Sequence, residues 1–248
     1  TAIEHNSVLR PLYLMEKRGV CLTVVSADKK GHVDVQGIAD AIRPETKAVV
    51  VTHASNVTGN VIDIKAIGEI CNSKDLLFIL DATQSAGLLP INMKEFGISA
   101  LCCSGHKNLF GPTGIGVLCL AKRILPFPLK AGGTGVDSFS HEMPRYLPVA
   151  LESGTLNIHG IAGLLTACKY LNTYGQLRIL KEATELANMF TDGIKNFPGV
   201  TIYGDLDAKV RIPIVALNLR DIDSGRIADE LFCRFGIATR AGIHCAPE

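Results

Sequence analysis

The first half of the chain alternates short apolar runs with segments of helical periodicity. Several of these runs are apolar throughout and lack the polar alternation of a strand with one solvated face. Strands that are buried on both faces of a parallel sheet have this pattern. The predicted strands are Cys21 to Val25, Ala48 to Thr52, Leu76 to Leu80, Ala100 to Cys103 and Ile115 to Leu120.

Helices are predicted between these strands, from Val35 to Ile42 and from Asp63 to Ser73. Asp63 is the expected N-cap of the second helix, because a carboxylate there accepts hydrogen bonds from unpaired backbone N–H groups. The order of strands and helices predicts an α/β domain with a mostly parallel β-sheet sandwiched by helices.

The second half of the chain follows a different pattern. Residues 121–151 are rich in Gly and Pro and have no clear period, so they predict long loops of the kind that are often functional. Two helices follow, from Ile158 to Tyr174 and from Gln176 to Phe197. The remaining elements predict a small α+β unit; they are Val200 to Tyr203, Ile214 to Leu219, a helix from Ser224 to Phe235, and Ile237 to Arg240. We expect a large domain over residues 1–170 and a small domain over residues 171–248.

Composition and charge narrow the class of protein. A chain of 248 residues with 47% hydrophobic residues can bury a substantial core. The formal net charge of +1 gives no electrostatic motive for binding nucleic acid or an anionic membrane. The apolar stretches are far shorter than the roughly 20 residues that a membrane span needs, and no signal peptide opens the chain. A small molecule or another protein is therefore the expected partner.

Eight cysteines raise the question of disulfides. Seven of them lie in or beside apolar strand-like runs or in helical patterns, so buried free thiols are the simpler interpretation. The chain has no C-x-x-C pair and no cluster of carboxylates and histidines with metal spacing, which argues against a structural metal site. This cysteine usage predicts a cytoplasmic protein.

Two polar segments directly follow predicted strands: Asp81-Ala82-Thr83-Gln84 and Ser104-Gly105-His106-Lys107. In an open α/β sheet, ligands bind beyond the carboxyl ends of the strands, where both segments are expected to lie. An aldehyde cofactor needs a lysine for a Schiff base, an acid for its pyridine nitrogen, and short polar groups for its phosphate. Together the two segments predict a site for pyridoxal 5'-phosphate, with Lys107 and Asp81 at its centre.

Each of these residues has a simpler interpretation when it is taken alone. Asp81 is then a turn or capping residue, Lys107 a solvated lysine, and Ser104 and His106 turn residues. Their combination favours the cofactor site. The glycines of residues 111–116 match neither a Walker loop nor a G-x-G-x-x-G fingerprint, so they offer no nucleotide site.

Six motifs in a fixed order resemble one known family. The chain is similar to class V aminotransferases of the cysteine desulfurase family, which are fold-type I pyridoxal phosphate enzymes. The motifs are Glu4-His5-Asn6-Ser7, Thr52-His53-Ala54-Ser55-Asn56-Val57-Thr58-Gly59, Asp81-Ala82-Thr83-Gln84, Ser104-Gly105-His106-Lys107, Glu152-Ser153-Gly154-Thr155-Leu156-Asn157 and Arg240-Ala241-Gly242-Ile243-His244-Cys245-Ala246-Pro247. Each motif is weak alone, whereas the ordered set is specific.

The resemblance implies a role for each cofactor residue. Lys107 holds the cofactor as a Schiff base, Asp81 pairs with the pyridinium nitrogen, and His5 stacks on the ring and helps to move protons. Thr155 reaches the phosphate of the partner subunit's cofactor, which implies a homodimer with shared sites. The other implied ligands are Gln84 for the ring hydroxyl, Ser104 and His106 for the phosphate, and Asn56 for the ring and the substrate carboxylate.

Cys245 distinguishes a desulfurase from related enzymes. Taken alone, it is one more small hydrophobic residue, but it lies in a loop with Gly, His and Pro beyond an arginine. The resemblance implies that its thiolate attacks the sulfur of cofactor-bound L-cysteine, forms a persulfide and leaves alanine. Arg240 is then placed to bind the substrate carboxylate. His244 either shuttles protons or only shapes the loop.

The remaining histidines carry no site prediction. His53 is expected either to support the site residues from behind or to be a packing residue near Asn56, and a ligand role has no motif support at His32, His141 and His159.

The resemblance also implies that both termini of the family are missing, so the chain is expected to be an internal fragment. The parent protein is then expected to supply sulfur to an acceptor protein, for iron–sulfur clusters or thiolated products. Three alternatives to an active desulfurase stay open: a selenocysteine lyase, another class V lyase or aminotransferase with an incidental Cys245, and a non-catalytic dimerisation or binding module.

Overall fold

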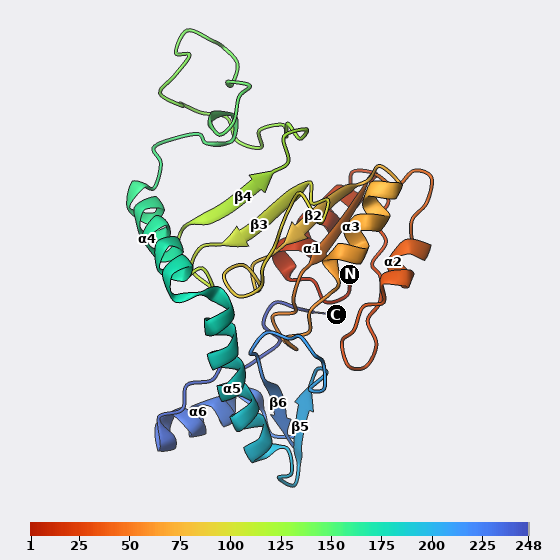
Figure 1. The fold of residues 1–248 in the computed structure, drawn as a ribbon, viewed down its shortest axis with the longest axis vertical. Helices are drawn as coiled ribbons and strands as arrows, with labels where there is room; N and C mark the ends of the chain where they lie inside the picture. Colours follow the sequence, from red (N-terminus) through yellow and green to blue (C-terminus); the bar gives the residue numbers. More distant parts are fainter. Residues whose placement is uncertain (248) are drawn as a thin grey trace.

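A four-stranded sheet forms the centre of the molecule (Figure 1). The computed structural model describes residues 1–247. The strands lie in chain order, β1 (Ala48–Thr52), β2 (Leu77–Asp81), β3 (Ala100–Ser104) and β4 (Gly116–Leu120). The first three are parallel and β4 is antiparallel to β3. The mostly parallel sheet predicted from the apolar runs is therefore confirmed, with strand ends shifted by one residue or less.

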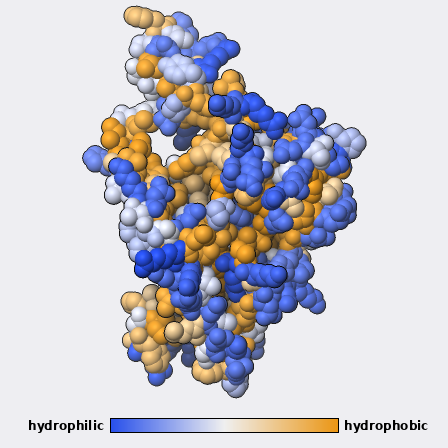
Figure 2. Space-filling model, viewed as in Figure 1, coloured by the Kyte–Doolittle hydropathy of each residue, from blue (hydrophilic) through white to orange (hydrophobic). Residues whose placement is uncertain are grey.

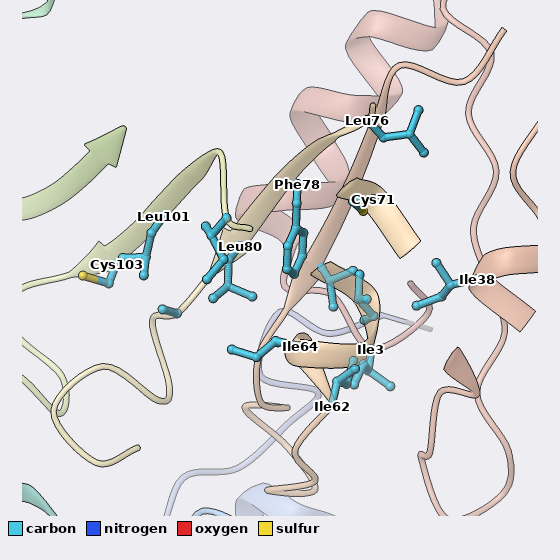
Figure 3. Close-up of a cluster of buried hydrophobic side chains, with 14 residues drawn as sticks. Ile3, Ile38, Ile62, Ile64, Cys71, Leu76, Phe78, Leu80, Leu101 and Cys103 are labelled. Atoms are coloured by element: carbon cyan, nitrogen blue, oxygen red, sulfur yellow. The ribbon is translucent and has the colours of Figure 1, made fainter. Parts of the chain in front are cut away.

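One face of the sheet packs against helices and forms the main core. Phe78 and Leu80 of β2 and Leu101 of β3 join residues of α2 (Val35–Asp40) and α3 (Ile64–Ser73) in one buried cluster (Figure 3). Asp63 caps α3 as predicted, because its carboxylate accepts from the N–H groups of residues 65 and 66. The helix buries its apolar stripe and thereby covers the sheet.

The opposite face of the sheet is open over β3 and β4 in this chain. Asp81, Cys102 and Leu118 are neighbours across β2, β3 and β4, so their side chains share that face. Cys102 and Leu118 are exposed. Burial of the strands on both faces, as the apolar runs predicted, is therefore wrong for this face of the described chain.

The cysteine prediction needs the same correction. All eight cysteines are free, but burial holds for only two of them, Cys71 and Cys103. Burial raises the pKa of both thiols to about 11, so they stay protonated near neutral pH. Cys168 is partly buried, and the exposed cysteines are Cys21, Cys102, Cys119, Cys233 and Cys245. Side chains of a strand alternate between faces, so an apolar run alone cannot say which cysteine is covered.

Two helices lead from the sheet to a smaller antiparallel pair of strands (Figure 1). They are α4 (Ile158–Tyr174) and α5 (Gln176–Ile194), and Gly175 with a φ of +94° lies between them. The pair is β5 (Val200–Tyr203) and β6 (Ala216–Leu219), followed by α6 (Ser224–Phe235). Residues 121–148 project as a long loop, as the sequence predicted.

Two local predictions failed, and one helix was missed. The run from Cys21 to Val25 is not a strand, because its backbone meets only residue 2, whose N–H donates to the carbonyl of Val25 over 2.8 Å. Residues 237–240 form no strand either, since no neighbouring strand pairs with them among residues 1–247. A helix that the sequence analysis did not predict, α1 (Asn6–Glu16), follows the first motif directly. Within the described residues, no helix is both long and apolar enough to cross a membrane.

Candidate functional site

The two central residues of the predicted site come from neighbouring parallel strands. Asp81 is the last residue of β2, and Lys107 follows the end of β3 by three residues. Parallel strands present their carboxyl ends at the same edge of a sheet, where ligands bind in this class of fold. The topology therefore places both segments at one edge.

Two contacts lock the segments that carry these residues. The side-chain amide of Asn108 donates to the backbone carbonyl of Gln84 over 2.7 Å. Gly87, with a φ of +92°, lies so close to the backbone of Asn108 that an added Cβ would meet the carbonyl oxygen of Asn108 at 2.0 Å. Only glycine fits there. Lys107 is thereby held in a fixed relation to the turn that begins at Asp81.

Asp81 is itself fixed by the turn that it starts. The side chain is buried, with 8% exposure, and its Oδ1 accepts a hydrogen bond from the N–H of Thr83 over 2.9 Å. This local bond is the turn role that the sequence analysis considered for an isolated aspartate. The turn orients the carboxylate and does not exclude a second role at the sheet edge.

Lys107 lies in an unusual electrostatic setting. Its pKa is lowered, chiefly because partial burial penalises the ammonium form. Asp81 opposes the shift, Arg240 adds to it, and Cys245 opposes it. Charges act on one another in this way only when they are near, so the structure brings these four residues into one region. A lysine with a lowered pKa has a larger fraction of the neutral amine that attacks a carbonyl.

His5 faces the same charges. Its pKa is lowered, first by burial and then by Lys107, while Asp81 raises it and Arg240 lowers it. The ring is also the N-cap of α1, because its Nδ1 accepts a hydrogen bond from the N–H of Ser7 over 3.1 Å. In the neutral ring, a proton on the other nitrogen, Nε2, fits this bond.

Glu4 anchors this histidine to the sheet, and the sequence analysis assigned it no role. The carboxyl group is fully buried, and its Oε1 accepts from the N–H of Thr52 over 2.9 Å, at the end of β1. Its Oε2 is buried with no hydrogen-bond partner among the described residues. Burial raises the pKa of Glu4, which favours the protonated form. The neighbouring Glu-His pair in the sequence was the available signal.

His53 has the packing role that the sequence predicted. It is 5% exposed, and its Nδ1 lies 2.8 Å from the hydroxyl oxygen of the buried Ser85. Burial lowers its pKa to about 4, so the ring is neutral near pH 7. Its backbone N–H donates to the carbonyl of Asp81 over 2.9 Å, which extends the pairing of β1 and β2 into the site.

Cys245 lies in a tight turn that two asparagines hold. The side-chain amide of Asn56 donates to the carbonyl of His244 over 2.8 Å, and the backbone N–H of Asn6 donates to the carbonyl of Cys245 over 2.8 Å. The turn closes through a bond from the N–H of Ala246 to the carbonyl of Ile243 over 3.1 Å. Asn56 thus holds the residue that directly precedes Cys245.

This turn is strained. His244 has a φ of +54° and Cys245 a φ of +60°, in the left-handed region that both central residues of a type I′ turn require. Residues other than Gly, Asn and Asp adopt that region at a cost of roughly 1–2 kcal/mol each. The strained backbone persists here because contacts from other elements hold it. The thiol itself is exposed.

Four further predicted site residues lie at less well-defined positions. Ser104 ends β3 and is partly buried, whereas His106 is exposed beside it. Arg240 is exposed too, and its charge reaches Lys107 and His5. Thr155 is exposed just before α4, and among the described residues its side chain makes no hydrogen bond to another predicted site residue. The structure thus does not join Thr155 to the rest of the set within one chain.

Other histidines contribute no site. His32 binds Asp205, with 3.0 Å between Nε2 and Oδ2, and this contact joins the first part of the chain to the loop after β5. Within residues 1–247 no group of three or more His, Cys, Asp or Glu side chains is arranged to hold a metal ion.

The side chains at this edge fit the predicted cofactor. A buried carboxylate suits a pyridinium nitrogen, and a lysine with a lowered pKa suits an aldehyde. A neutral imidazole in the same charge field suits the face of an aromatic ring. Carboxylate, amine and imidazole are the set of groups that this chemistry needs.

Comparison with known proteins points the same way. The family model described as Aminotransferase class-V matches residues 1–248. A protein of Methanothermobacter thermautotrophicus called a probable cysteine desulfurase is 34% identical over 248 residues, covering 98% of this chain and 62% of that protein. The cysteine desulfurase IscS of Vibrio cholerae is 35% identical over 210 residues, covering 84% of this chain and 48% of that protein.

Solved structures have the same fold. The apo structure of a cysteine desulfurase from Thermococcus onnurineus superposes with a TM-score of 0.87 and 30% identity, covering 99% of this chain and 62% of that one. The cysteine desulfurase CsdA of Escherichia coli gives a TM-score of 0.88 and 26% identity, covering 99% of this chain and 61% of that one. The chain thus spans about three fifths of the length of these relatives.

Proposed function

Because the chain belongs to the class V aminotransferase / cysteine desulfurase family, we propose that its parent protein is a pyridoxal phosphate-dependent cysteine desulfurase. The reaction converts L-cysteine to L-alanine and leaves a persulfide on Cys245. The observation that supports this most is the common electrostatic field of Lys107, Asp81, His5 and Cys245.

Pyridoxal phosphate, when bound, supplies an electron sink that makes the Cα–H bond of an amino acid acidic. Lys107 offers the amine that binds the aldehyde, and its lowered pKa favours the uncharged form. Asp81 offers the buried carboxylate that keeps a pyridinium protonated. His5 holds a proton on Nε2 and can pass it within the site.

The remaining residues bind and orient in this proposal. Ser104 and His106 bind the phosphate, Gln84 the ring hydroxyl, Asn56 the ring and the substrate carboxylate, and Arg240 the same carboxylate. Arg240 fits this role because a guanidinium binds a carboxylate with two parallel hydrogen bonds. Cys245 is exposed on its turn, which fits a thiol that receives sulfur from a bound substrate and passes it to a sulfur-acceptor protein.

We also propose a homodimer. Within residues 1–247, the exposed Thr155 side chain makes no hydrogen bond to the predicted site of its own chain, which fits a role at the partner's phosphate. The long loop before it exposes Phe127, Leu129 and Phe139 at 93%, 97% and 103%, and apolar side chains also gather on α4 (Figure 2). Exposed apolar patches of this kind mark interfaces. Light scattering tests this directly, since the proposal requires twice the mass of one chain.

We place this enzyme in the cytosol. Its eight free thiols fit a reducing compartment better than an oxidising one.

Two measurements test the proposal. Mixing the full-length parent with pyridoxal phosphate should give a visible absorption band that borohydride bleaches, and L-cysteine should then yield alanine and, under a reductant, sulfide. Replacing Cys245→Ala should stop sulfide release while the band remains. A protein that stays colourless, or one that makes no alanine, contradicts the proposal.

The same variant separates the alternative activities. In a selenocysteine lyase, another lyase or an aminotransferase with an incidental thiol, Cys245→Ala retains turnover. In a non-catalytic dimerisation module, no band forms in either protein.

A further inference from the structure

The turn Ile243–Ala246 carries Cys245, and its two strained residues are His244 and Cys245. The backbone carbonyl groups of both residues accept hydrogen bonds from outside the turn. His244 accepts from the side-chain amide of Asn56, and Cys245 accepts from the N–H of Asn6. The other end of the segment is tied to α6, where the N–H of Gly242 donates to the hydroxyl of Ser224 over 3.3 Å. Hydrogen bonds thus connect the turn to α6 on one side and to the site on the other. No side chain of residues 241–247 is buried.

The backbone N–H of Asn6, which donates to the carbonyl of Cys245, has no hydrogen-bond acceptor within its own helix. Asn6 is the first residue of α1, and the first N–H groups of a helix have no partner within it. The carbonyl of Cys245 satisfies one of these groups. This bond is therefore a specific reporter of whether the turn is docked, because the Asn6 amide has no other partner in the helix.

The Asn56 contact has a competitor. The proposed function gives the same side-chain amide a ligand to bind, the cofactor ring or the substrate carboxylate. The amide nitrogen has two N–H groups and donates one of them to the His244 carbonyl. A ligand that takes this N–H, or that rotates the amide to reach it, therefore weakens one of the two bonds that hold a strained turn.

We propose that Asn56 is a positioning residue for Cys245: together with the Asn6 N–H it clamps the strained Ile243–Ala246 turn against the site, and it releases the turn when a ligand engages its amide. Release lets His244 and Cys245 relax to negative φ and lets the thiol travel between the site and an acceptor. The inference rests on the proposed function for its ligand, while the clamp itself concerns this chain alone.

Hydrogen exchange at the Asn6 amide tests the clamp. In the chain without cofactor, this amide should exchange at least about tenfold more slowly than an unprotected amide, since exchange requires the turn to undock. Asn56→Asp removes the donor and sets a carboxylate against the His244 carbonyl, so exchange should accelerate about tenfold or more. His244→Gly should slow it, because glycine adopts positive φ without strain.

The control is Asn188→Asp, the same chemical change on the exposed surface of α5. It should leave Asn6 exchange unchanged, and the amides of Phe78 and Leu80 in β2 should be unaffected by every variant. An Asn6 amide that is unprotected in the wild type, or equally protected in Asn56→Asp, overturns the clamp.

Pyridoxal phosphate tests the release. Once its visible band has formed, Asn6 exchange should accelerate in the wild type, and the cofactor should add nothing in Asn56→Asp. A band without any acceleration overturns the release. If no band forms, the proposed function has failed instead, and the comparison of cofactor-free proteins still decides the clamp.

Discussion

The two sides of the candidate site are built by different forces. On the sheet side, Asp81 ends β2, whose core residues Phe78 and Leu80 are fully buried, and Lys107 follows the end of the neighbouring β3. On the thiol side, Cys245 follows α6, a helix with no buried residue. Burial fixes the first side and a few hydrogen bonds fix the second.

Under the proposed function, this difference gives each side the mechanical property that its chemistry needs. A cofactor must be held within a fraction of an ångström by a rigid shell. A sulfur carrier must move, and segments with few buried contacts and exposed hydrogen bonds open at low free energy. In the proposed desulfurase, one site thus combines a rigid binding edge with a movable nucleophile.

Removing the Lys107 amine should have the largest effect of all the changes that test the contrast between the two sides. Lys107→Ala in the parent enzyme should lower turnover at least about a thousandfold, the scale on which loss of a covalent or proton-transferring group slows an enzyme. The band that borohydride bleaches should disappear with it. Lys122→Ala, at an exposed lysine, is the matched control and should change neither. Full activity in Lys107→Ala would remove the lysine from the chemistry.

Truncation of one aromatic side chain on each side compares their packing. Phe78→Ala should lower the free energy of unfolding by roughly 3–5 kcal/mol, because it opens a cavity in the core. Phe232→Ala, at a residue of α6 that is 63% exposed, should change it by less than about 0.5 kcal/mol. Urea denaturation followed by circular dichroism measures both. Equal losses would show that α6 is covered in solution and would end the contrast.

The pH dependence of stability tests the burial of His53. Its pKa is about 4 in the folded chain and 6.5 in the unfolded one, so protonation favours unfolding. Above pH 6.5, His53 should not change the free energy of unfolding. As the pH falls from 6.5 to 4, it should lower the free energy of unfolding by up to about 3 kcal/mol, and below pH 4 it should lower it no further.

Comparison with His53→Gln isolates this contribution, because Glu4 has a raised pKa and shifts stability in the opposite direction as the pH falls. His159→Gln, at an exposed histidine, is the control. Parallel pH curves for the wild type and His53→Gln would contradict the buried, neutral ring.

Two aspartate N-caps give the smallest and most closely matched test. Asp63 caps α3 and Asp223 caps α6, each through its carboxylate. Asp63→Ala should lower global stability by about 1 kcal/mol, because α3 is part of the core. Asp223→Ala should leave the melting temperature unchanged and only accelerate hydrogen exchange in the first turn of α6. The opposite ranking would show that α6 belongs to the cooperative unit.

Local sequence signals identified much of the sheet side. The apolar run that ends at Asp81 and the run that ends before Lys107 each predicted a strand and a polar group at its carboxyl end. The cap at Asp63 followed from a single carboxylate before a helical pattern. These predictions succeeded because hydrophobic periodicity and helix capping depend only on residues that lie within a few positions of one another in the sequence.

Signals that need a distant partner failed or were missed. The run from Cys21 to Val25 has a strand composition but no adjacent strand, and Cys102 lies in an apolar run yet is exposed. The carboxyl group of Glu4 holds α1 to the sheet through the N–H of Thr52, which lies 48 residues away in the sequence. Pairing and coverage are properties of the whole fold.

The sequence by itself determined the family, the order of the strands and helices around the sheet, and the types of residue at the strand ends, because motifs, periodicity and capping are written in neighbouring positions. Only the tertiary structure decided that Asn6 and Asn56 hold the turn of Cys245, and that one face of the sheet lies open. Such contacts join residues about 190 to 240 positions apart, and the free energy that forms them depends on how the entire chain packs.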